Sequence, residues 1–444
     1  MKMKKAMNIL LAGMMCVGSF AGCGSGTGDT DAAGGETAEN TEVSEEAKDS
    51  GGSEGDPVVL KFFHYKSEWS DGFQEVFDEL EKDYNIRVEQ ESASSTVYFE
   101  TLQAKLISGE MPDIFHMLVG KSNFDAWNTE CADLYGEDWV DKVPENIVEM
   151  CDYDGKLLAM PLGLEAYSIA YNKDLFEEAG IEELPTTITE LREVCEQLEA
   201  AGIQPFINAY TDVAHVVRRM FTTPFAHREN AMEYFDDVLE NGGDFTEDAS
   251  FQAYYDFLDL TMEYGNDDAL TLDFNTERSS FINGEAAMVA GEGMWLKSIA
   301  DNAGIDIRMG LLPILTSDNE EIENVLFSIP QSFCVYEGSE HVEEAKIALN
   351  YMLTSPAADK FFEAMGAYPA YEDSNVDISA MGDMAVDFQK YLEEDKTYVM
   401  LGPSFPAAAQ EDIFASVQKY LAGKATREES LQEITDSWNR NINQ

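Results

Sequence analysis

A stretch near the N-terminus, residues 24–56, cannot contribute to a folded core. It consists mainly of Gly, Ser, Thr, Ala and acidic residues, with Lys48 as its only basic residue and no aromatic residue. Such a composition buries too little apolar surface to offset the entropy lost on ordering, so residues 23–56 are predicted to be a disordered tether rather than a structured segment. Folding is thereby confined to about 390 residues from Pro57 onward, more than the roughly 250–300 at which single cores stop growing. Two lobes are expected.

The segment ahead of the tether is typical of an export signal. Three lysines, Lys2, Lys4 and Lys5, precede a run of mostly apolar and small residues that extends to Phe20. A basic start, an apolar run of roughly 7–15 residues and small residues at the cleavage site define such a signal.

The four residues that end at Cys23 point to a lipid anchor. Their sequence, FAGC, resembles the lipobox of bacterial lipoproteins, whose cysteine receives a diacylglyceryl group and becomes the new N-terminus. Residues 1–22 are therefore predicted to be a lipoprotein signal peptide and Cys23 the lipidation site; a plain secretory signal with a chance cysteine is the alternative. Two acyl chains anchor stably where one does not. No later run reaches the roughly 18 apolar residues of a membrane span, so we expect a protein anchored on the extracellular face of the cell membrane.

The charge of the chain excludes one class of partner. The sequence has 86 Asp and Glu residues against 28 Lys and Arg residues, a formal net charge of −58. Because so acidic a body repels polyphosphate, no nucleic acid is expected as a partner. Most of the charge is expected on a solvated surface that keeps the protein soluble as a monomer.

Four cysteines follow Cys23, and none suggests a metal site. No pair forms a CxxC motif or lies near a histidine at zinc-ligand spacing, so neither a metal nor a cofactor is predicted. Cys195 falls on a helix face and Cys334 in a strand, and both are expected to be small buried hydrophobic residues. Cys131 and Cys151 are left open as buried thiols or as a disulfide, since exported proteins carry disulfides.

Strand and helix patterns alternate at the start of the body. The sequence predicts strands at 58–63, 86–88 and 113–117 and helices at 73–83 and 98–108. This alternation is typical of βαβ units and predicts an α/β fold with a mostly parallel sheet. Ligands bind such sheets beyond the carboxyl ends of the strands, so the loops after Phe63 and Phe115 are expected at a binding cleft.

The rest of the body is rich in helix signals. Capping boxes at residues 187–190 and 426–429 predict helix starts. Further helices are predicted at 342–353 and 411–421, and short apolar strands at 205–208 and 287–290.

Five motifs spread over this body carry a family resemblance. They are SGEMPDI (108–114), PLGLEAYSIAYNKDLF (161–176), FINGEAAM (281–288), GMW (293–295) and LAGKATREE (421–429). In order and spacing they resemble bacterial extracellular solute-binding proteins of ABC sugar importers, of the maltose-binding type. The resemblance implies a periplasmic-binding-protein-like fold, with two α/β lobes joined by a hinge and a ligand cleft between them. It places the N-terminal lobe at 57–164 plus 327–372 and the C-terminal lobe at 165–326 plus 373–444.

The resemblance also indicates where a carbohydrate would bind. Sugars present hydroxyl groups, which suit polar side chains, and C–H faces, which stack on aromatic rings. The family match implies that Trp295 stacks on a sugar and that Glu165 contacts one, and glycines ahead of Trp295 are expected to let the ligand approach the backbone. Eight further candidates follow strand ends or adjoin these two: Tyr210, Asp212, Trp69, Tyr65, His64, His116, Glu292 and Tyr167. A place in the core or on the solvated surface is the alternative for each.

The leading functional hypothesis is a binding protein that hands a carbohydrate, an oligosaccharide, to the permease subunits of an ABC importer. A receptor for a polyamine or a peptide is the alternative within the binding class, because an acidic, aromatic-lined cleft also suits cations. A lipid-anchored glycoside hydrolase is the alternative from another class. It would need two carboxylates about 5–9 Å apart. The G-x-S-x-G match at residues 51–55 lies in the predicted tether, whereas a nucleophile elbow needs a strand before it and a helix after it. We therefore expect no enzymatic activity.

Overall fold

The computed structural model describes residues 55–94 and 97–442, and every structural statement below refers to these residues. They belong to one compact unit, Gly52–Gln444. Cys23, the predicted signal peptide and nearly all of the predicted tether lie outside the described residues.

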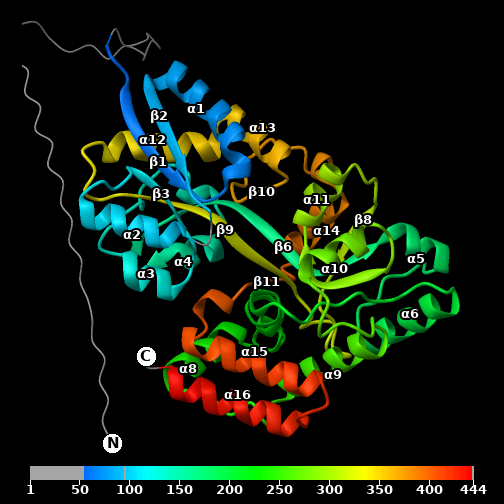
Figure 1. The fold of residues 1–444 in the computed structure, drawn as a ribbon. Coiled ribbons are helices and arrows are strands. Elements are labelled where there is room, and N and C mark those ends of the chain that lie inside the picture. The colour runs from blue at the N-terminus through cyan, green and yellow to red at the C-terminus, as the bar shows by residue number, and fades with distance from the viewer. Residues whose placement is uncertain (1–54, 95–96, 443–444) are drawn as a thin grey trace, which may run out of the picture. The chain divides into compact units, whose positions relative to one another are not determined.

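A nine-stranded mixed sheet runs through the described part of the chain (Figure 1). Its main path has the order β10-β6-β9-β3-β1-β2, with β11 paired to β9 and with β7 and β8 paired to β6. The strands are β1 (Val58–His64), β2 (Ile86–Ser92), β3 (Ile114–Met117), β6 (Met160–Asn172), β7 (Met288–Gly293), β8 (Met309–Leu312), β9 (Val325–Val335), β10 (Tyr368–Pro369) and β11 (Thr397–Val399). Two further strands, β4 (Asp152–Tyr153) and β5 (Lys156–Leu157), pair with each other.

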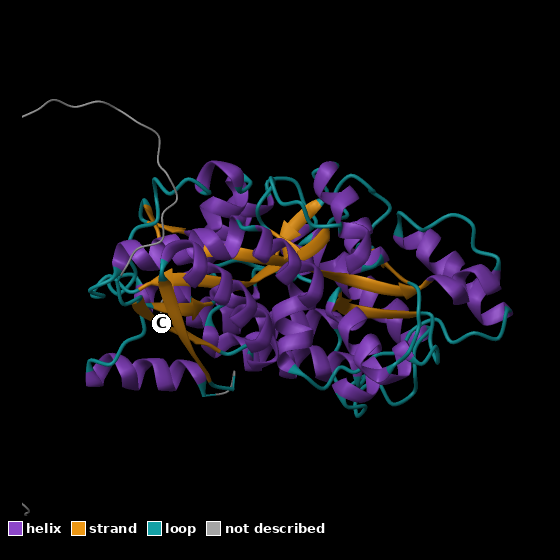
Figure 2. Cartoon of the chain, turned by 90° about the horizontal axis from the view of Figure 1, so that it is seen from above, coloured by secondary structure: helices purple, strands orange, loops and turns teal. Residues whose placement is uncertain are grey.

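Helices flank the strands on both sides (Figure 2). The α-helices are α1 (Ser70–Tyr84), α2 (Tyr98–Ser108), α3 (Lys121–Trp127), α4 (Glu145–Cys151), α5 (Lys173–Ala179), α6 (Ile188–Ala200), α7 (Thr223–Ala226), α8 (Ala231–Asn241), α9 (Ala249–Glu263), α10 (Phe274–Ile282), α11 (Trp295–Ala303), α12 (Val342–Thr354), α13 (Pro356–Met365), α14 (Asp383–Glu393), α15 (Ala407–Leu421) and α16 (Arg427–Asn441). Shorter turns of helix are η1 (Ser67–Trp69), η2 (Val140–Lys142), η3 (Ala214–Arg219), η4 (Met220–Thr222), η5 (Ile378–Met381) and η6 (Gly402–Ser404).

The sheet is less parallel than the sequence predicted. β1 pairs in parallel with β2 and β3, as the βαβ pattern requires, so the carboxyl ends of these strands lie together. In contrast, β3 pairs antiparallel with β9, and β6 pairs antiparallel with β7, β8, β9 and β10. Beyond the first three strands only β11 pairs in parallel, with β9, so the expectation of a mostly parallel sheet is wrong for the described residues. β9 reaches the sheet after a long excursion of the chain, and a connection of that length can return a strand in either direction.

Two hydrophobic cores lie on opposite faces of the long strand β6. Leu162 and Leu164 belong to the first core, whereas Tyr167, Ile169 and Tyr171 belong to the second. Successive side chains of a strand point to opposite faces, so alternate residues of β6 supply the two cores. β6 is therefore apolar and buried almost throughout its length. The lobe boundaries given above stay a prediction.

Aromatic rings fill much of the second core. Trp438 of α16 packs against Phe225, Phe245 and Phe405, with ring centroids 5.4, 5.6 and 5.4 Å apart. Its indole Nε1–H donates to the carbonyl oxygen of Val238 at 2.8 Å, so its polar atom is satisfied inside the core. Trp438 thus represents a tryptophan with a purely structural role.

Both predicted helix starts are found. The Thr187 hydroxyl accepts from the N–H of Glu190 and opens α6. Thr426 and Glu429 form the complete reciprocal capping box at the start of α16. At α6 the return bond differs, because the Glu190 carboxylate accepts from the N–H of Thr186 at 2.8 Å. The Glu190 carboxylate thus bonds to the residue before the N-cap, and not to the N-cap residue Thr187 as the motif predicts.

The cysteines of the described residues are buried free thiols: Cys131, Cys151, Cys195 and Cys334. The disulfide between Cys131 and Cys151, one of the two alternatives, is not formed. Burial raises the pKa of Cys334, and the neighbouring Cys131 thiol raises it further. These side chains fill space in the interior as small hydrophobic groups.

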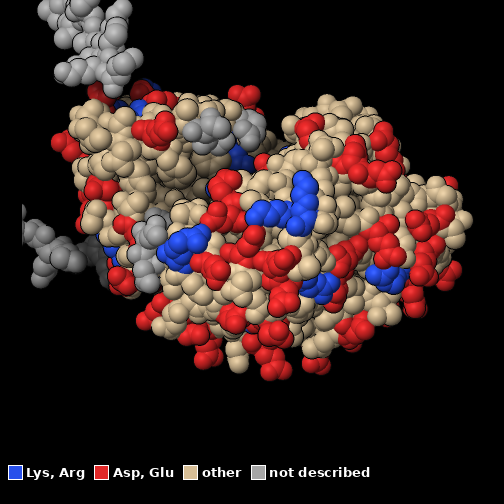
Figure 3. Space-filling model, turned by 60° about the horizontal axis from the view of Figure 1, so that its bottom comes forward, with Lys and Arg blue, Asp and Glu red and all other residues tan. Residues whose placement is uncertain are grey.

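Acidic side chains are spread over the face of the molecule that Figure 3 draws. Figure 3 shows Asp and Glu side chains scattered over the whole visible face, with only a few Lys and Arg side chains among them. This distribution is that of a solvated, repulsive surface.

Candidate ligand-binding site

A cavity of about 200 Å³ brings together three of the predicted ligand-binding residues, Trp69, Glu165 and Trp295. Its walls come from η1, from the middle of β6, from the first turns of α11, from the end of α13 and from η5. The complete lining is Lys66, Trp69, Glu165, Met294, Trp295, Lys297, Ser298, Asp301, Glu363, Ala364, Met365, Gly366, Ala380 and Met381. Since η1 follows β1 almost directly, the cavity lies beyond the carboxyl end of that strand, where the sequence predicted a cleft.

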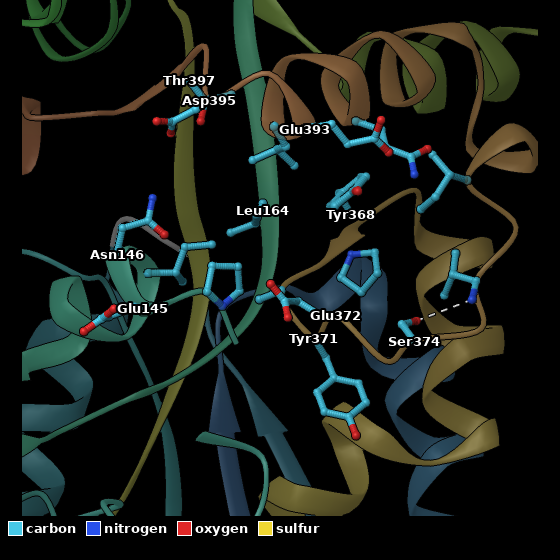
Figure 4. A pocket seen from close by; sticks show the side chains of 18 of the residues that line it. Glu145, Asn146, Leu164, Tyr368, Tyr371, Glu372, Ser374, Glu393, Asp395 and Thr397 are labelled. Carbon is cyan, nitrogen blue, oxygen red and sulfur yellow. Dashed lines mark hydrogen bonds between the residues drawn. The ribbon is translucent and has the colours of Figure 1, made fainter. Parts of the chain in front are cut away.

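A larger cavity of about 900 Å³ contains none of the predicted residues. Leu164 lines it, and because successive side chains of β6 point to opposite faces, it lies across that strand from Glu165. Figure 4 shows its polar wall, with Glu372, Ser374 and Glu393 around Tyr368. We take the smaller cavity as the candidate site because two indole rings meet both signs of charge there.

Trp69 and Glu165 are held by the elements around them. The Trp69 ring packs edge-on against Phe361 of α13, with centroids 5.4 Å apart. Lys66 Nζ lies 5.0 Å from the centroid of the Trp69 ring and 4.0 Å from Glu165 Oε1. Gln331 of β9 donates to the same carboxylate oxygen at 3.1 Å. The cavity therefore offers a carboxylate, an ammonium group and an aromatic ring in fixed relation.

Trp295 is half-buried at the start of α11 and faces this cavity from the other side. Its indole Nε1–H donates to Glu292 Oε2. The guanidinium carbon of Arg219 lies 4.6 Å from the centroid of its ring, within the range of a cation–π contact.

Glu292 lies behind Trp295 and does not line the cavity. The residue is fully buried, at 0% exposure. Its Oε1 accepts from Arg219 Nη1 and Arg278 Nη2, both at 3.0 Å, and its Oε2 accepts from Arg278 Nε at 2.9 Å. Both carboxylate oxygens thus accept hydrogen bonds from other protein groups. Glu292 therefore has no oxygen left for the ligand contact that the sequence predicted.

A second buried acid, Glu277, adjoins this network. Its Oε1 accepts from the N–H of Ala209, whereas its Oε2 has no hydrogen-bond partner. Burial raises the pKa of Glu277 well above its ordinary value, and the charge of Glu292 raises it further against the opposing effect of Arg278 and Arg219. Burial at this place therefore favours the neutral form of the Glu277 carboxyl group.

The same region holds potential metal ligands. Single ligand atoms of His215, Glu277 and Glu292 all lie within 4.8 Å of one another. Burial and the charges of Arg219 and Arg278 lower the pKa of His215 well below its ordinary value, which favours the neutral imidazole that a metal would need. The same two guanidinium groups already neutralise Glu292, however. An added cation would be repelled, so the arrangement favours an ion-pair network over a metal centre.

We expect Glu277→Gln to remove a pH-dependent loss of stability. Because the pKa is higher in the folded protein, the folded state keeps a proton that the unfolded chain releases above about pH 4.3, and the free energy of unfolding falls as pH rises through this range. Glutamine has the same shape and does not titrate. The variant should therefore gain stability relative to the parent between about pH 5 and about pH 8 in denaturant unfolding. An equal difference at both pH values would contradict the raised pKa.

Four aromatic candidates from the sequence lie in the interior: His64, His116, Tyr167 and Tyr210. Burial lowers the pKa of His116 to about 3, and its Nε2 lies 2.7 Å from the carbonyl oxygen of Pro330. The Tyr210 hydroxyl lies 2.6 Å from the hydroxyl of Thr261.

Two candidates are half-buried without reaching the cavity. Tyr65 stacks on His116 with ring centroids 4.1 Å apart. Asp212 accepts from the N–H of His215 at 2.8 Å and so supports the start of η3. Ligand contact by any of these six residues stays a prediction.

Tyr210 is buried because the strand expected just before it, at 205–208, does not form. Those residues make a single bridge, from Phe206 to Met288, and not a strand. The chain then turns into the second core, so residues after it do not emerge at a sheet edge.

The glycines before Trp295 also serve a different purpose from the one expected. A Cβ on Gly293 would collide with the carbonyl oxygen of Ala166 and lie 2.7 Å from Tyr167 Cα. Gly291 has φ of +71°, and a Cβ there would lie 2.7 Å from His215 Cε1. Both glycines allow β7 to approach protein segments; ligand access does not explain them.

The charged partners of the site were missed from the sequence. Lys66 directly follows Tyr65 in the predicted loop and could have been included with it. Arg219 precedes Glu292 by 73 positions and Arg278 precedes it by 14. Neither carries a local signal, because the tertiary structure brings them to Glu292.

The fold and this cavity define a class: an α/β protein with two cores, crossed by a shared strand that carries a polar and aromatic site. The family profile described as "Bacterial extracellular solute-binding protein" matches residues 66–359, more than half of the chain. The chain belongs to this family, and the resemblance seen in the sequence is confirmed.

Known relatives agree with this assignment. The multiple sugar-binding protein of Streptococcus mutans is 21% identical over 396 residues, which cover 84% of this chain and 88% of that protein. The apo form of RafE from Streptococcus pneumoniae superposes with a TM-score of 0.76 at 18% identity, covering 88% of this chain and 100% of that one. The complex of RafE with raffinose gives a TM-score of 0.70 at 18% identity, covering 87% and 100%. The predicted periplasmic-binding-protein-like α/β fold is thus confirmed.

Proposed function

We propose that this protein is a lipid-anchored extracellular receptor that captures a neutral carbohydrate, an oligosaccharide, and delivers it to the permease of an ABC importer. The observation that carries the proposal is the meeting of Trp69, Trp295 and Glu165 in one cavity. Two indole rings suit the C–H faces of sugar rings, and the carboxylate suits paired hydroxyl groups. The names of the relatives, a multiple sugar-binding protein and a raffinose complex, support the same ligand class.

The charges of the cavity favour a neutral ligand over a polyamine. Lys66 lies 4.0 Å from Glu165, and Lys297 forms an ion pair with Asp301. A polycation would meet two ammonium groups in the lining and would have to compete with them for Glu165 and Asp301. The third lining carboxylate, Glu363, accepts a hydrogen bond from the N–H of Asp377. A sugar can bridge such groups through its hydroxyls without displacing charge.

Delivery would follow from closure of the two lobes over the sugar. A ligand that contacts both Trp69 and Trp295, which fall in different predicted lobes, would stabilise the closed arrangement by its differential affinity for that state. The permease would then recognise the closed form. We propose that the protein performs no chemistry on its ligand.

A thermal-shift screen tests the ligand class. The panel should contain monosaccharides, raffinose and longer oligosaccharides, with spermidine and a short peptide as the contrasting ligands. We expect the melting temperature to rise with one or more oligosaccharides and to stay unchanged with spermidine and the peptide. Chromatography of the recovered sugar should show it intact, whereas shortened products would favour a hydrolase.

The anchor is tested separately at Cys23, which is proposed to carry two acyl chains. No helix in the described part of the chain has both the length and the apolarity that a membrane span needs. We expect Cys23→Ala to shift the protein from the membrane fraction to the medium, because the acyl chains supply the membrane affinity. Cys16→Ala is the matched control and should leave the protein with the membrane. Equal retention of the Cys23 variant would contradict lipidation there.

A further inference from the structure

We infer that Glu292 is a positioning residue, whose buried carboxylate fixes the indole of Trp295 in the orientation that receives the sugar. The effect of Glu292 on sugar affinity rests on the proposed function. The way in which Glu292 holds Trp295 rests on the geometry around its carboxylate alone.

The carboxylate is saturated with donors. Four N–H groups reach it: one from Arg219, two from Arg278 and the indole Nε1–H of Trp295. An ionised carboxylate accepts about four hydrogen bonds, so each acceptor direction is used. Because Glu292 is at 0% exposure, these bonds are shielded from bulk water. The direction of the Trp295 N–H is therefore set by a group that cannot itself rotate freely.

The two arginines hold the ring from behind. The guanidinium carbon of Arg219 lies 4.6 Å from the Trp295 ring centroid, and that of Arg278 lies 4.0 Å from the ring centroid of Phe274. Each guanidinium is thus fixed by the carboxylate at its edge and by an aromatic ring at its face. Arg219 lies against the Trp295 ring and is absent from the cavity lining, whereas Trp295 lines the cavity.

Such an arrangement raises affinity by preorganisation. A tryptophan that is free to rotate loses conformational entropy when a ligand fixes it, whereas one already held in place does not. Glu292 would therefore contribute to sugar affinity through Trp295, without touching the ligand.

The experiment combines Glu292→Gln with Trp295→Phe, singly and together. Glutamine keeps the size of the side chain but removes the charge and one acceptor, so Arg278 loses its two-point contact. The control is Glu323→Gln, since Glu323 is another buried carboxylate, paired with His227 at 2.9 Å and absent from the cavity lining. Any general effect of losing a buried negative charge should appear in the control as well.

The first readout is the tryptophan emission of the ligand-free protein. We expect Glu292→Gln to change the emission spectrum when Trp295 is present and to leave it unchanged in the Trp295→Phe background. A change of equal size in both backgrounds would overturn the inference. This readout needs no sugar, so it decides the role of Glu292 even if the proposed function fails.

The second readout is calorimetric binding of raffinose, or of the best oligosaccharide from the thermal-shift panel. Glu292→Gln should raise Kd about tenfold or more, as expected for loss of a charge-assisted hydrogen bond, and less than about twofold in the Trp295→Phe background. An equal rise in both backgrounds, or an equal rise in Glu323→Gln, would overturn the inference. Should Glu292→Gln fail to fold, Glu292→Asp replaces it, because aspartate keeps the charge and moves the carboxylate by one methylene. Its effects on the emission spectrum and on Kd should likewise appear only when Trp295 is present.

Discussion

Trp295→Ala is expected to weaken sugar binding by about 1–3 kcal/mol, roughly five- to 150-fold in Kd. The lower value corresponds to the loss of one stacking face, and the upper value adds the apolar area left uncovered. Because Trp295 is half-buried and joins both cores at their edge, the variant should still fold. Calorimetry with the sugar found in the panel measures the binding effect, and thermal unfolding of the ligand-free variant measures the structural effect.

Trp438→Ala provides the matched control for this substitution. Trp438 is fully buried and packed among phenylalanines, so its truncation should cost about 3–5 kcal/mol of stability. Binding per folded molecule should stay unchanged in this control. If Trp295→Ala instead lowers stability as much as Trp438→Ala while binding sugar normally, Trp295 is a core residue and the site assignment is wrong.

The sequence predicted helices well where the spacing of apolar residues and the capping residues indicate the same element. The helix predicted at 98–108 is α2 (Tyr98–Ser108), and the predicted start at Thr426 is the start of α16. These features depend on residues close in sequence, namely apolar spacing and side chains that bond to the nearest free N–H groups. They are therefore readable without the tertiary structure.

Strand pairing was less predictable. The antiparallel pairing of β3 with β9 joins residues about 220 positions apart, and nothing local to either strand gives its direction. The strand expected at 205–208 fails for a related reason. Apolar residues there satisfy the pattern of a strand, but the backbone makes only one bridge to β7 and is otherwise bonded to loops.

The candidate site was predicted in part. Trp69, Glu165 and Trp295 were found because the aromatic and acidic residues stand at strand ends or in motifs that resemble the family. The same reasoning placed Glu292 in the cleft, although the structure buries it beneath two arginines. A sequence shows that a carboxylate lies near a tryptophan, but it does not show which distant guanidinium groups consume its oxygens.

The second large effect is expected at Gly293, the last residue of β7. A methyl group there would collide with the Ala166 carbonyl oxygen and lie 2.8 Å from Tyr167 Cβ, so β7 and β6 would have to separate. Both obstacles belong to the backbone or its first side-chain atom, and they cannot rotate away. We expect Gly293→Ala to lower the free energy of unfolding by about 3 kcal/mol, the upper end of the cost of overpacking. Denaturant unfolding measures this loss.

Gly304→Ala is the matched control, because it separates steric collision from backbone strain. Gly304 ends α11 with φ of +69°, and a Cβ there would meet nothing within 4 Å. Its substitution should cost only about 1 kcal/mol, the penalty for a left-handed backbone at a non-glycine residue. Trp295 follows Gly293 by two residues, so the position of its ring depends on β7. Gly293→Ala should therefore also weaken sugar binding, at least in proportion to the loss of folded protein, whereas Gly304→Ala should not. Equal stability of the two variants would show that β7 can move away from β6, and that the close approach of these strands does not fix the position of Trp295.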